Sequence, residues 1–591
     1  MLYFKAMYIE SVPNRNSPPA TLLRESYRDE NGKVKKRTLA NLSSCSAEQI
    51  AAFKTILKGG HASALPLDEQ FEIQRSLPHG HVAAILGTFR RLKLHNLLER
   101  KSSDERSLAM ALIAGRILYP GSKLALSRHL NPNTATSTLG QELGLKEVNE
   151  HDLYGAMRWL FDRQDKIQNR IAKCHLSEGS AVLYDLSSTY YEGSTCALAK
   201  RGHNRDGKKG KRQINFGLLT TAQGCPIAVE VFPGNTPDPN TVSSQLKTLR
   251  QRFGLKKIVI VGDRGMITSA RIDALCDDSE LGDFGWISAL RSDQIRKLAD
   301  GKHFQPELFD QRDLAEITAE DEFPGERLVV CRNPTLAGER KRKRDELLAE
   351  TENKLQEIAS ACSRSRAPYH GKDKIARRLE REASKYKMLK HFDLEITETS
   401  LSFSRKEESI AAEAALDGFY IIRAGRVTAN EFDANSLVET YKSLSGVERA
   451  FRAIKTTSLH VRPIFHHEED MVRAHIFVCM LAYYLRWHLE QQLKPLLFND
   501  EEPGGGPRKS PVAKAQRSKR GNRKAATKQT DDGLSAHSFA TLLQDLGTLS
   551  RHEIRAAIPG GAVFHKLTDP TAIQARAFEV LGVKPSPLPH M

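Results

Sequence analysis

The most constraining feature of the chain is a run of four apolar residues, Ile258 to Val261, followed at once by Gly262 and Asp263. A run without polar alternation predicts a short strand buried on both faces, as in the middle of a sheet with parallel neighbours. Asp and Gly are also frequent turn residues, so the carboxylate after the strand is either part of a simple turn or a functional group. The surrounding sequence bears on this choice.

The residues from 180 to 292 predict an α/β unit around that strand. SAVLYDLSSTYYEG, RQINFGLLTT and CPIAVEVF are rich in β-forming residues, and a turn at Ala222-Gln223-Gly224 joins the last two into a hairpin. Helices are expected at about 238–253 and in MITSARIDALC, and a further strand in FGWISALR. A strand and a helix resume in GFYIIRAG and SLVETYKSLSGVERAFRAIKTT. We therefore interpret 293–416 as an insertion in one continuing α/β domain.

A second carboxylate lies inside the first predicted strand of this unit. Asp185 follows Leu183 closely and precedes Leu186. An Asp in such a strand is disfavoured by propensity and costly to bury without a partner. Either it binds a cation, or it faces the surface and is hydrogen-bonded there.

The helix predicted after the insertion carries a third acid. Tyr441, Glu448 and Lys455 are spaced seven and seven, and positions seven apart drift by only ~20° around a helix axis. A continuous helix would place them on one stripe, beside an apolar stripe that docks on the sheet. That apolar stripe contains Leu444, Val447, Phe451 and Ile454. Ser445-Gly446 could break the helix, and an ordinary amphipathic helix is the alternative.

Charge points to a polyanionic partner. The net charge of +17 over 591 residues favours nucleic acid, although solubility alone is an alternative explanation. The loop GHNRDGKKGKR at 202–212 nearly matches a nucleotide-binding loop, but Lys209 follows Lys208 where Ser or Thr is required. We interpret it as a basic loop beside the active site that touches DNA, with a solvated turn as the alternative.

Cysteine spacing and hydropathy argue for a reducing, aqueous compartment. The eight cysteines are scattered singly without a C-x-x-C pair, so neither a disulfide framework nor a zinc site is indicated. The first residues show no secretory signal pattern. The longest apolar run, 476–485, is too short for a membrane span of ~20 residues and predicts a core helix. We expect a soluble, cytoplasmic protein.

Several motifs together resemble those of the bacterial DDE insertion-sequence transposases. VLYDLSST, VIVGDRGM and YKSLSGVERAFRAIK resemble the acidic motifs of the group whose third acid lies in a Y-x2-R-x3-E-x6-K signature. Tyr441, Glu448 and Lys455 match that signature, whereas Leu444 stands at its arginine position. INFGLLTTAQGCPIAVEVFPGNTPD and HVRPIFHHEEDMVRAHIFVCMLAYYL are similar to flanking family segments. The resemblance covers about 180–292 and 417–490.

The resemblance implies an α/β fold with an RNase H-like core, a mixed sheet flanked by helices that an insertion interrupts. In that fold the first Asp lies on the first strand, the second just after the fourth, and the Glu on a later helix. The expected segments are a small N-terminal unit with a β-hairpin (1–75), a helical DNA-binding region (76–178), the first part of the core (179–292), the insertion of charged helices and a β-hairpin (293–416), the second part of the core (417–492), a disordered basic linker (493–534) and a helical C-terminal tail (535–591).

The resemblance also implies a site. Asp185 would bridge two Mg²⁺ ions, which Mn²⁺ can replace, while Asp263 and Glu448 would each complete one ion. The expected DNA-binding residues are Tyr441, Lys455, Arg264, Lys208 and Lys209, with Arg449 or Arg452 supplying the phosphate contact that Leu444 cannot make.

The implied function is DNA transposition in the bacterial cytoplasm, in association with the nucleoid. The enzyme would cut double-stranded DNA at inverted-repeat ends and join the 3′-hydroxyls to target DNA, as a homodimer when two ends are paired. A related nuclease that does not join DNA, and a catalytically inactive DNA-binding derivative, are the alternatives.

Overall fold

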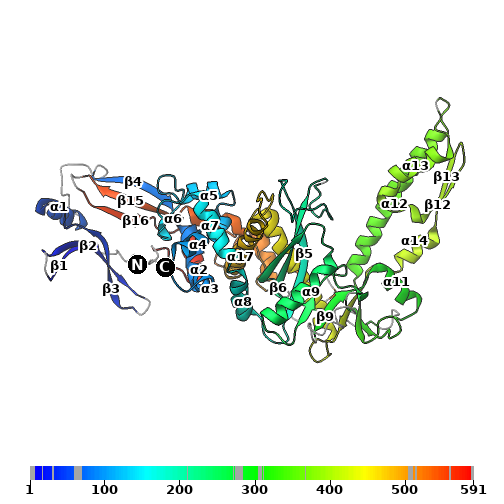
Figure 1. Cartoon of the computed structure of the whole chain (residues 1–591), viewed down its shortest axis with the longest axis horizontal. Helices are drawn as coiled ribbons and strands as arrows, with labels where there is room; N and C mark the ends of the chain where they lie inside the picture. The colour runs from blue at the N-terminus through cyan, green and yellow to red at the C-terminus, as the bar shows by residue number, and fades with distance from the viewer. Residues whose placement is uncertain are drawn as a thin grey trace.

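The computed structural model has an elongated shape (Figure 1). A small sheet lies at one end, a helical region and a large sheet occupy the middle, and a helical arm projects at the other end. The structure describes all residues except 1–6, 16–17, 30–31, 59–69, 209, 271, 273–283, 304–308, 311, 367, 503–509, 511, 513–515, 558–560 and 587–591.

The large sheet has eight strands in the order β10-β11-β14-β9-β8-β5-β6-β7. β5, β8 and β9 run parallel, and every other neighbouring pair is antiparallel. The strands are β5 (Ala181–Tyr190), β6 (Gln213–Thr221), β7 (Pro226–Pro233), β8 (Val259–Val261), β9 (Gly285–Ala289), β10 (Leu314–Ile317), β11 (Glu326–Arg332) and β14 (Phe419–Gly425).

The apolar run that precedes Gly262 and Asp263 contains β8, and all residues of this strand are buried. It lies in the middle of the sheet between two parallel neighbours, which confirms the interpretation of its unbroken apolar run. Trp286 of β9 is also in the core, at 2% exposure. Residues 271 and 273–276 of the helix expected in MITSARIDALC lie outside the described residues.

The other elements of this domain are helices, which come from both parts of it. They are α9 (Val242–Lys247) continued by η2 (Asp238–Thr241) and η3 (Thr248–Arg252), α15 (Ala434–Lys442), α16 (Leu444–Arg452), η7 (Ala453–Thr457), α17 (Glu469–Leu493) and η8 (Lys494–Leu496). α17 contains the longest apolar run and is buried along most of its length, as expected of a core helix. Within the described residues, no helix is long and apolar enough to cross a membrane.

The predicted insertion is continuous with the large sheet where it begins. β10 and β11 pair next to β14 and extend the sheet, so only the later part of 293–416 forms the arm. The other elements of the segment are α11 (Ser292–Asp300), α12 (Pro334–Cys362), α13 (Lys372–Glu382), η5 (Ser384–Tyr386), η6 (Leu389–His391), β12 (Phe392–Ile396), β13 (Leu401–Arg405) and α14 (Glu407–Ala414). Leu348, Leu355 and Ile358 of α12 are buried in a separate arm core.

The N-terminal region contains the expected hairpin and helices. β2 and β3 pair antiparallel, with residues 30 and 31 of their turn outside the described residues. The elements before β5 are β1 (Met7–Val12), β2 (Ala20–Arg28), β3 (Val34–Asn41), α1 (Ala47–Leu57), β4 (Phe71–Pro78), α2 (Gly80–Arg91), α3 (Leu94–Leu98), α4 (Asp104–Leu118), α5 (Lys123–Leu130), α6 (Leu139–Glu142), α7 (Glu150–Phe161) and α8 (Gln164–His175).

The C-terminal tail differs from its prediction, because it contains strands and folds back on the N-terminal region. β15 (Ser550–Ala556) lies between β16 (Val563–Leu567) and β4 in a three-stranded sheet. α19 (Phe539–Gly547) and α20 (Ala572–Leu581) contribute buried residues to the main core. One of the two strands that pair with β15 is β4, which lies near the other end of the sequence. The local sequence pattern alone could not reveal this pairing.

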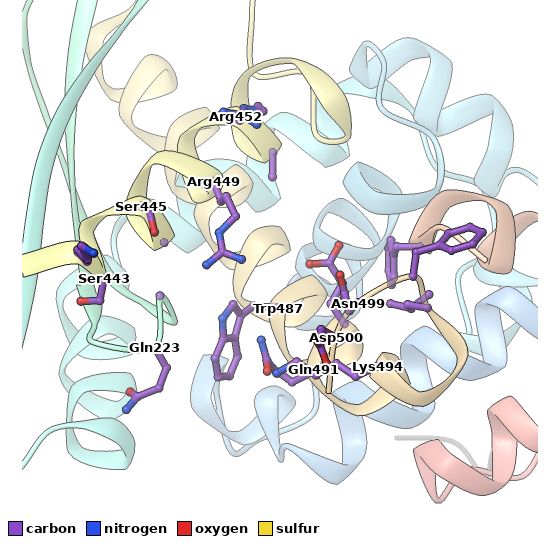
Figure 2. A pocket seen from close by; sticks show the side chains of 18 of the residues that line it. Gln223, Ser443, Ser445, Arg449, Arg452, Trp487, Gln491, Lys494, Asn499 and Asp500 are labelled. Carbon is purple, nitrogen blue, oxygen red and sulfur yellow. The ribbon is translucent and has the colours of Figure 1, made fainter. Parts of the chain in front are cut away.

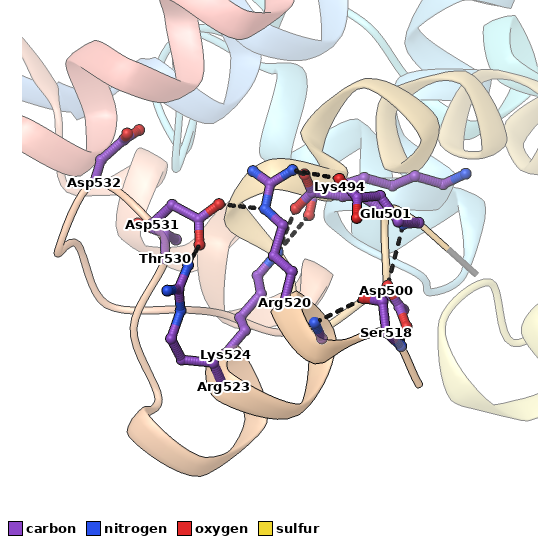
Figure 3. Close-up of polar contacts among 12 residues, drawn as sticks. Lys494, Asp500, Glu501, Ser518, Arg520, Arg523, Lys524, Thr530, Asp531 and Asp532 are labelled. Atoms are coloured by element: carbon purple, nitrogen blue, oxygen red, sulfur yellow. Dashed lines mark hydrogen bonds and ion pairs between the residues drawn. The ribbon is translucent and has the colours of Figure 1, made fainter. Parts of the chain in front are cut away.

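The prediction of a disordered linker over 493–534 is also wrong in part. α18 (Lys519–Thr527) is a described helix within it. Its basic side chains pair with acids that lie before and after the helix (Figure 3). Lys524 Nζ lies 2.7 Å from Glu501, Arg520 lies 3.0 Å from the same carboxylate, and Arg523 lies 2.9 Å from Asp531. The counter-charges come from residues on both sides of α18. The basic composition of the segment alone therefore did not reveal that its charges are paired.

Candidate active site

Two of the predicted acids lie at the same edge of the large sheet. β5 and β8 are parallel, and Leu183 pairs with Val261 as the last residue pair in their register. Asp185 and Asp263 each come two positions after that pair, so the two strands deliver them side by side. The register of two parallel strands therefore explains why the carboxylates are so distant in sequence yet neighbours in space.

Asp263 serves as both a turn residue and an accessible acid. Its Oδ1 accepts hydrogen bonds from the backbone N–H groups of Gly265 (3.0 Å) and Met266 (2.8 Å). Ser288 of β9 donates to its backbone oxygen at 3.2 Å. The side chain is exposed. The turn thus fixes one carboxylate oxygen through backbone N–H groups, and the exposed side chain can still serve as a functional acid, so the two interpretations of this residue do not exclude each other.

Asp185 is in a much less polar position. Its Oδ1 accepts a hydrogen bond from Leu186 N at 2.7 Å, and the residue is only partly exposed. The pKa of Asp185 is raised to about 7: burial is the main cause, the negative charges of Asp263 and Glu448 add to it, and the Leu186 N–H and Arg205 oppose the shift. The carboxylates of Asp263 and Glu448 therefore lie within electrostatic reach of Asp185.

Glu448 reaches the acids from α16, whose apolar face docks on the sheet. Val447, Ala450 and Phe451 are buried, and the Phe451 ring packs against Phe216 of β6 with centroids 5.4 Å apart. Glu448 itself is exposed at the edge of this contact. The predicted docking face is confirmed.

The predicted single helix through Tyr441, Glu448 and Lys455 is wrong. The chain breaks between α15 and α16 at Ser443, whose N–H bonds back to Glu439 O and whose carbonyl accepts from Gly446 N at 2.7 Å. Tyr441 nevertheless lies within electrostatic reach of the acids: burial first, and then Asp263 and Glu448, raise the pKa of its phenol to about 12.

The three carboxylates do not form a tight cage for one ion. Among the described residues, their oxygens are not all within 4.8 Å of one another. Two ions ~3.5–4 Å apart, each bound ~2 Å from oxygen, allow the outer two carboxylates of a bridged site to be well over 4.8 Å apart.

Comparisons with known proteins agree with these motifs. Residues 179–485, slightly more than half of the chain and inclusive of all three acids, match the family described as transposase DDE domain. The chain belongs to the DDE transposase family. Residues 9–66 also match the N-terminal domain of IS1634 family transposases, which confirms an insertion-sequence transposase.

Two further comparisons add little to this assignment. No curated protein matches the transposase significantly. A solved structure described as the piggyBac transposase synaptic complex with hairpin DNA is 9% identical, with a TM-score of 0.31, over 79% of this chain and 76% of that chain. A TM-score this low does not establish a common fold. The family match alone makes the transposase a DNA-binding, DNA-cutting enzyme of transposition, in a family that generally uses divalent metal ions.

The transposase holds its signature lysine in an internal ion-pair network. Lys455 lies in the wide helical turn η7, and its Nζ is 3.0 Å from Asp206 Oδ1. Arg462 Nη1 lies 2.6 Å from the same oxygen, and the Asp206 side chain is only 2% exposed. Burial lowers the pKa of Lys455 and Asp206 opposes that shift. Sequence analysis missed Asp206, because an acid in a basic loop gives no signal of its own.

The basic loop 202–212 lies beside the acids of the transposase. Arg205 lowers the pKa of Asp185 and also pairs with Asp238, so it is a second residue that the sequence argument overlooked. Lys208 is exposed and lies over the ring of Tyr190, 5.9 Å from its centroid. Lys209 lies outside the described residues. Arg264 is exposed and acts electrostatically on Tyr441.

Arg449 and Arg452 line a groove on another side of α16 (Figure 2). Arg449 extends from α16 toward Trp487 of α17 (Figure 2). The groove has a volume of about 1660 Å³, larger than the ~300–1,000 Å³ of small-molecule pockets. The three acids are not among its lining residues. Arg449 and Arg452 thus line a groove to which none of the three acids contributes a lining residue.

Proposed function

We propose that the transposase cuts DNA at the inverted-repeat ends of its own element and joins the released 3′-hydroxyls to target DNA. The observation that supports this proposal is that β5 and β8 end side by side before Asp185 and Asp263, while the charges of Asp263 and Glu448 both raise the pKa of Asp185. Three acids in mutual repulsion are a site for cations, because a cation removes the repulsion that burial makes costly.

We also propose an RNase H-like core for the domain. The order β7-β6-β5-β8-β9, with an antiparallel first half and a parallel second half, supports it. Asp185 lies on the first strand of this set and Asp263 just after the fourth, as the fold requires. Glu448 follows on a later helix.

The donor set fits two Mg²⁺ ions, with Mn²⁺ as a substitute. Carboxylate oxygens are the ligands that these hard cations prefer, and Asp185 would bridge the pair while Asp263 and Glu448 each complete one ion. When bound, such ions neutralise charge on the attacking and leaving oxygens of an in-line displacement. Asp263 Oδ1 is held by two backbone N–H groups, so its second oxygen is oriented before any ligand arrives.

Residues around the acids would position the DNA backbone. Tyr441 keeps its phenolic proton at neutral pH, because its pKa is about 12, so its hydroxyl can donate a hydrogen bond to a phosphate oxygen. Arg264 and Arg205 act electrostatically on Tyr441 and Asp185, respectively. We assign to these two, in place of Arg449 and Arg452, the phosphate contact that Leu444 cannot provide. Lys208 and Lys209 would extend the contact along the loop.

A joining assay tests the proposal. The protein is incubated in Mg²⁺ with duplexes that carry the terminal repeats flanking its gene, either intact or already cut to expose the 3′-hydroxyl, and with a target plasmid. We expect cutting of the intact ends and joining of the pre-cut ends. Cutting without joining would identify a nuclease, and binding without either reaction an inactive derivative.

A pair of variants links that chemistry to the site. Asp263→Asn should abolish cutting and joining while DNA binding persists. The matched control is Asp293→Asn, at an exposed position in the first turn of α11, which should leave all three properties unchanged. Because two ends must be paired, we expect at least a dimer in the joining complex, which mass photometry with end DNA can measure.

A further inference from the structure

A second group of metal-ligating side chains lies away from the acids. His175 ends α8, Cys225 follows the turn after β6, and His488 lies on α17. The ligand atoms of these three residues all lie within 4.8 Å of one another. Within the described part of the chain, no other set of three His, Cys, Asp or Glu ligand atoms is this close.

Each imidazole of this group has a ring nitrogen that is available to bind a metal ion. His175 Nε2 bonds to the Tyr484 hydroxyl at 2.9 Å, which orients the ring and leaves Nδ1 for a ligand. His488 Nε2 is buried and has no hydrogen-bond partner among the described residues. Burial lowers the pKa of both rings and so favours their neutral form. A buried imidazole nitrogen without a partner calls for an explanation.

We propose that His175, Cys225 and His488 bind one Zn²⁺ ion. A thiolate and two imidazoles suit this borderline-soft cation and are poor ligands for Mg²⁺, so the site is distinct in chemistry from the three acids. Tetrahedral bonds of ~2.0–2.3 Å place neighbouring ligand atoms about 3.5 Å apart, so the side chains close slightly around the ion. Binding releases the Cys225 proton and forms a Zn–S bond, and a water molecule takes the fourth position.

The position of the group suggests a structural role. The ion would tie the helical region, through α8, to the hairpin turn after β6 and to α17. That turn also contacts the helix of the third acid: a Cβ built on Gly446 of α16 would lie 3.4 Å from Gly224 Cα. Gly224 adopts φ +85°, which only glycine adopts without strain. The ion would therefore hold the turn on which the N-terminal end of α16 rests, two residues before Glu448.

Metal analysis of the full-length protein tests this inference. The protein is stripped with a chelator, dialysed against Zn²⁺ in excess Mg²⁺, and its metal content is measured by mass spectrometry. We expect one zinc per chain, and a loss of affinity of at least ~100-fold in Cys225→Ser and in His488→Gln. The matched control is Cys174→Ser, which removes the exposed cysteine next to His175 and should bind zinc as the parent does.

Cobalt spectroscopy of the unaltered protein gives an answer even if a variant fails to fold. Co²⁺ in this site should show the intense thiolate-to-metal absorption of a Co–S bond, and Zn²⁺ should abolish it. Zn²⁺ should also raise the melting temperature of the parent and of Cys174→Ser. Absence of the thiolate band, or zinc binding that Cys225→Ser leaves unchanged, would overturn the proposal. Neither result depends on DNA cutting, so the function proposed above stands or falls separately.

Discussion

The two sides of α16 treat positive charge in opposite ways. On the side of the acids, Lys455 and Arg462 pair with the buried Asp206, and Arg205 pairs with Asp238. On the side of the groove, Arg449 has no ion-pair partner among the described residues. One side thus keeps negative charge that can attract cations, and the other leaves Arg449 without an ion pair among the described residues. The net charge of the chain reveals neither arrangement, because local pairing decides which charges are available.

The largest expected effect comes from removing the acid on this helix. Glu448→Gln should lower the rate of end cutting by at least ~10³-fold, about 4 kcal/mol of activation free energy, because an amide is a weak ligand for a hard cation. DNA affinity should stay within twofold, since the groove side is intact. Single-turnover cutting and a binding titration measure the two quantities.

The control for that variant is Glu408→Gln, at an exposed position on α14 of the arm. It should leave the cutting rate unchanged. A Glu448→Gln protein that cuts at the parental rate would show that α16 contributes no acid to the catalytic site. The two sides of the helix would then not differ in the way described above.

The strands next to Asp185 and Asp263 could be predicted from sequence, because a buried strand is rich in apolar residues. The unbroken apolar run of β8 and the acid that follows it required only local reasoning, and the family motifs then joined Asp185, Asp263 and Glu448. What local reasoning could not supply was pairing across the chain. Asp206 neutralises Lys455, and β15 completes a sheet with β4, through contacts between remote residues.

Breaking the ion-pair network on the acid side should mainly cost stability. Asp206→Asn leaves Lys455 and Arg462 without their shared counter-ion, and the loss of one partner of a buried pair costs about 3 kcal/mol. Chemical denaturation should therefore show a clearly lower midpoint. Asp373→Asn, at an exposed position on α13, is the control and should change the free energy of unfolding by less than ~0.5 kcal/mol. An Asp206→Asn protein of parental stability would mean that the network is dispensable.

The raised pKa of Asp185 should also make the free energy of unfolding depend on pH. The pKa of Asp185 is about 7 in the folded protein and near its ordinary 3.8 when unfolded. Between these values the folded state holds the extra proton, so the free energy of unfolding falls as pH rises from about 4 to 7 and stays lower above 7. Without divalent cations, Asp185→Asn should therefore be more stable than the parent at pH 8, by about 1–2 kcal/mol, because Asp185 remains partly exposed.

That advantage of the variant should shrink as the pH approaches 5. Mg²⁺ at pH 8 should raise the melting temperature of the parent but not of Asp185→Asn, since the cation takes the place of the proton. Equal pH dependence in the two proteins would show that Asp185 ionises normally and that the acids do not repel one another. Cutting should increase from pH 6 to pH 8 for the same reason, because only the carboxylate binds a hard cation.

The break at Ser443 shows why side-chain geometry was harder to predict than helix type. The seven-residue spacing of Tyr441 and Glu448 is the spacing expected on one face of a single helix. In the structure, however, the two residues lie on two helices, α15 and α16. Arg449 shows the opposite outcome. It lies next to Glu448 in sequence, and the ~100° rotation per residue of a helix turns it into the groove.

The smallest expected effect is on the groove side. Arg449→Ala should weaken DNA binding by about 1 kcal/mol, roughly fivefold, and reduce the slope of log affinity against log salt by about 0.9, the contribution of one phosphate contact. The cutting rate at saturating DNA should not change, because Arg449 extends toward Trp487 into the groove (Figure 2), which none of the three acids lines. Arg381→Ala, whose guanidinium is already 2.8 Å from Glu382, is the matched control and should leave the slope unchanged. If Arg449→Ala instead lowers the cutting rate and spares affinity, the arginine serves the acids after all, and the two sides of α16 form one site.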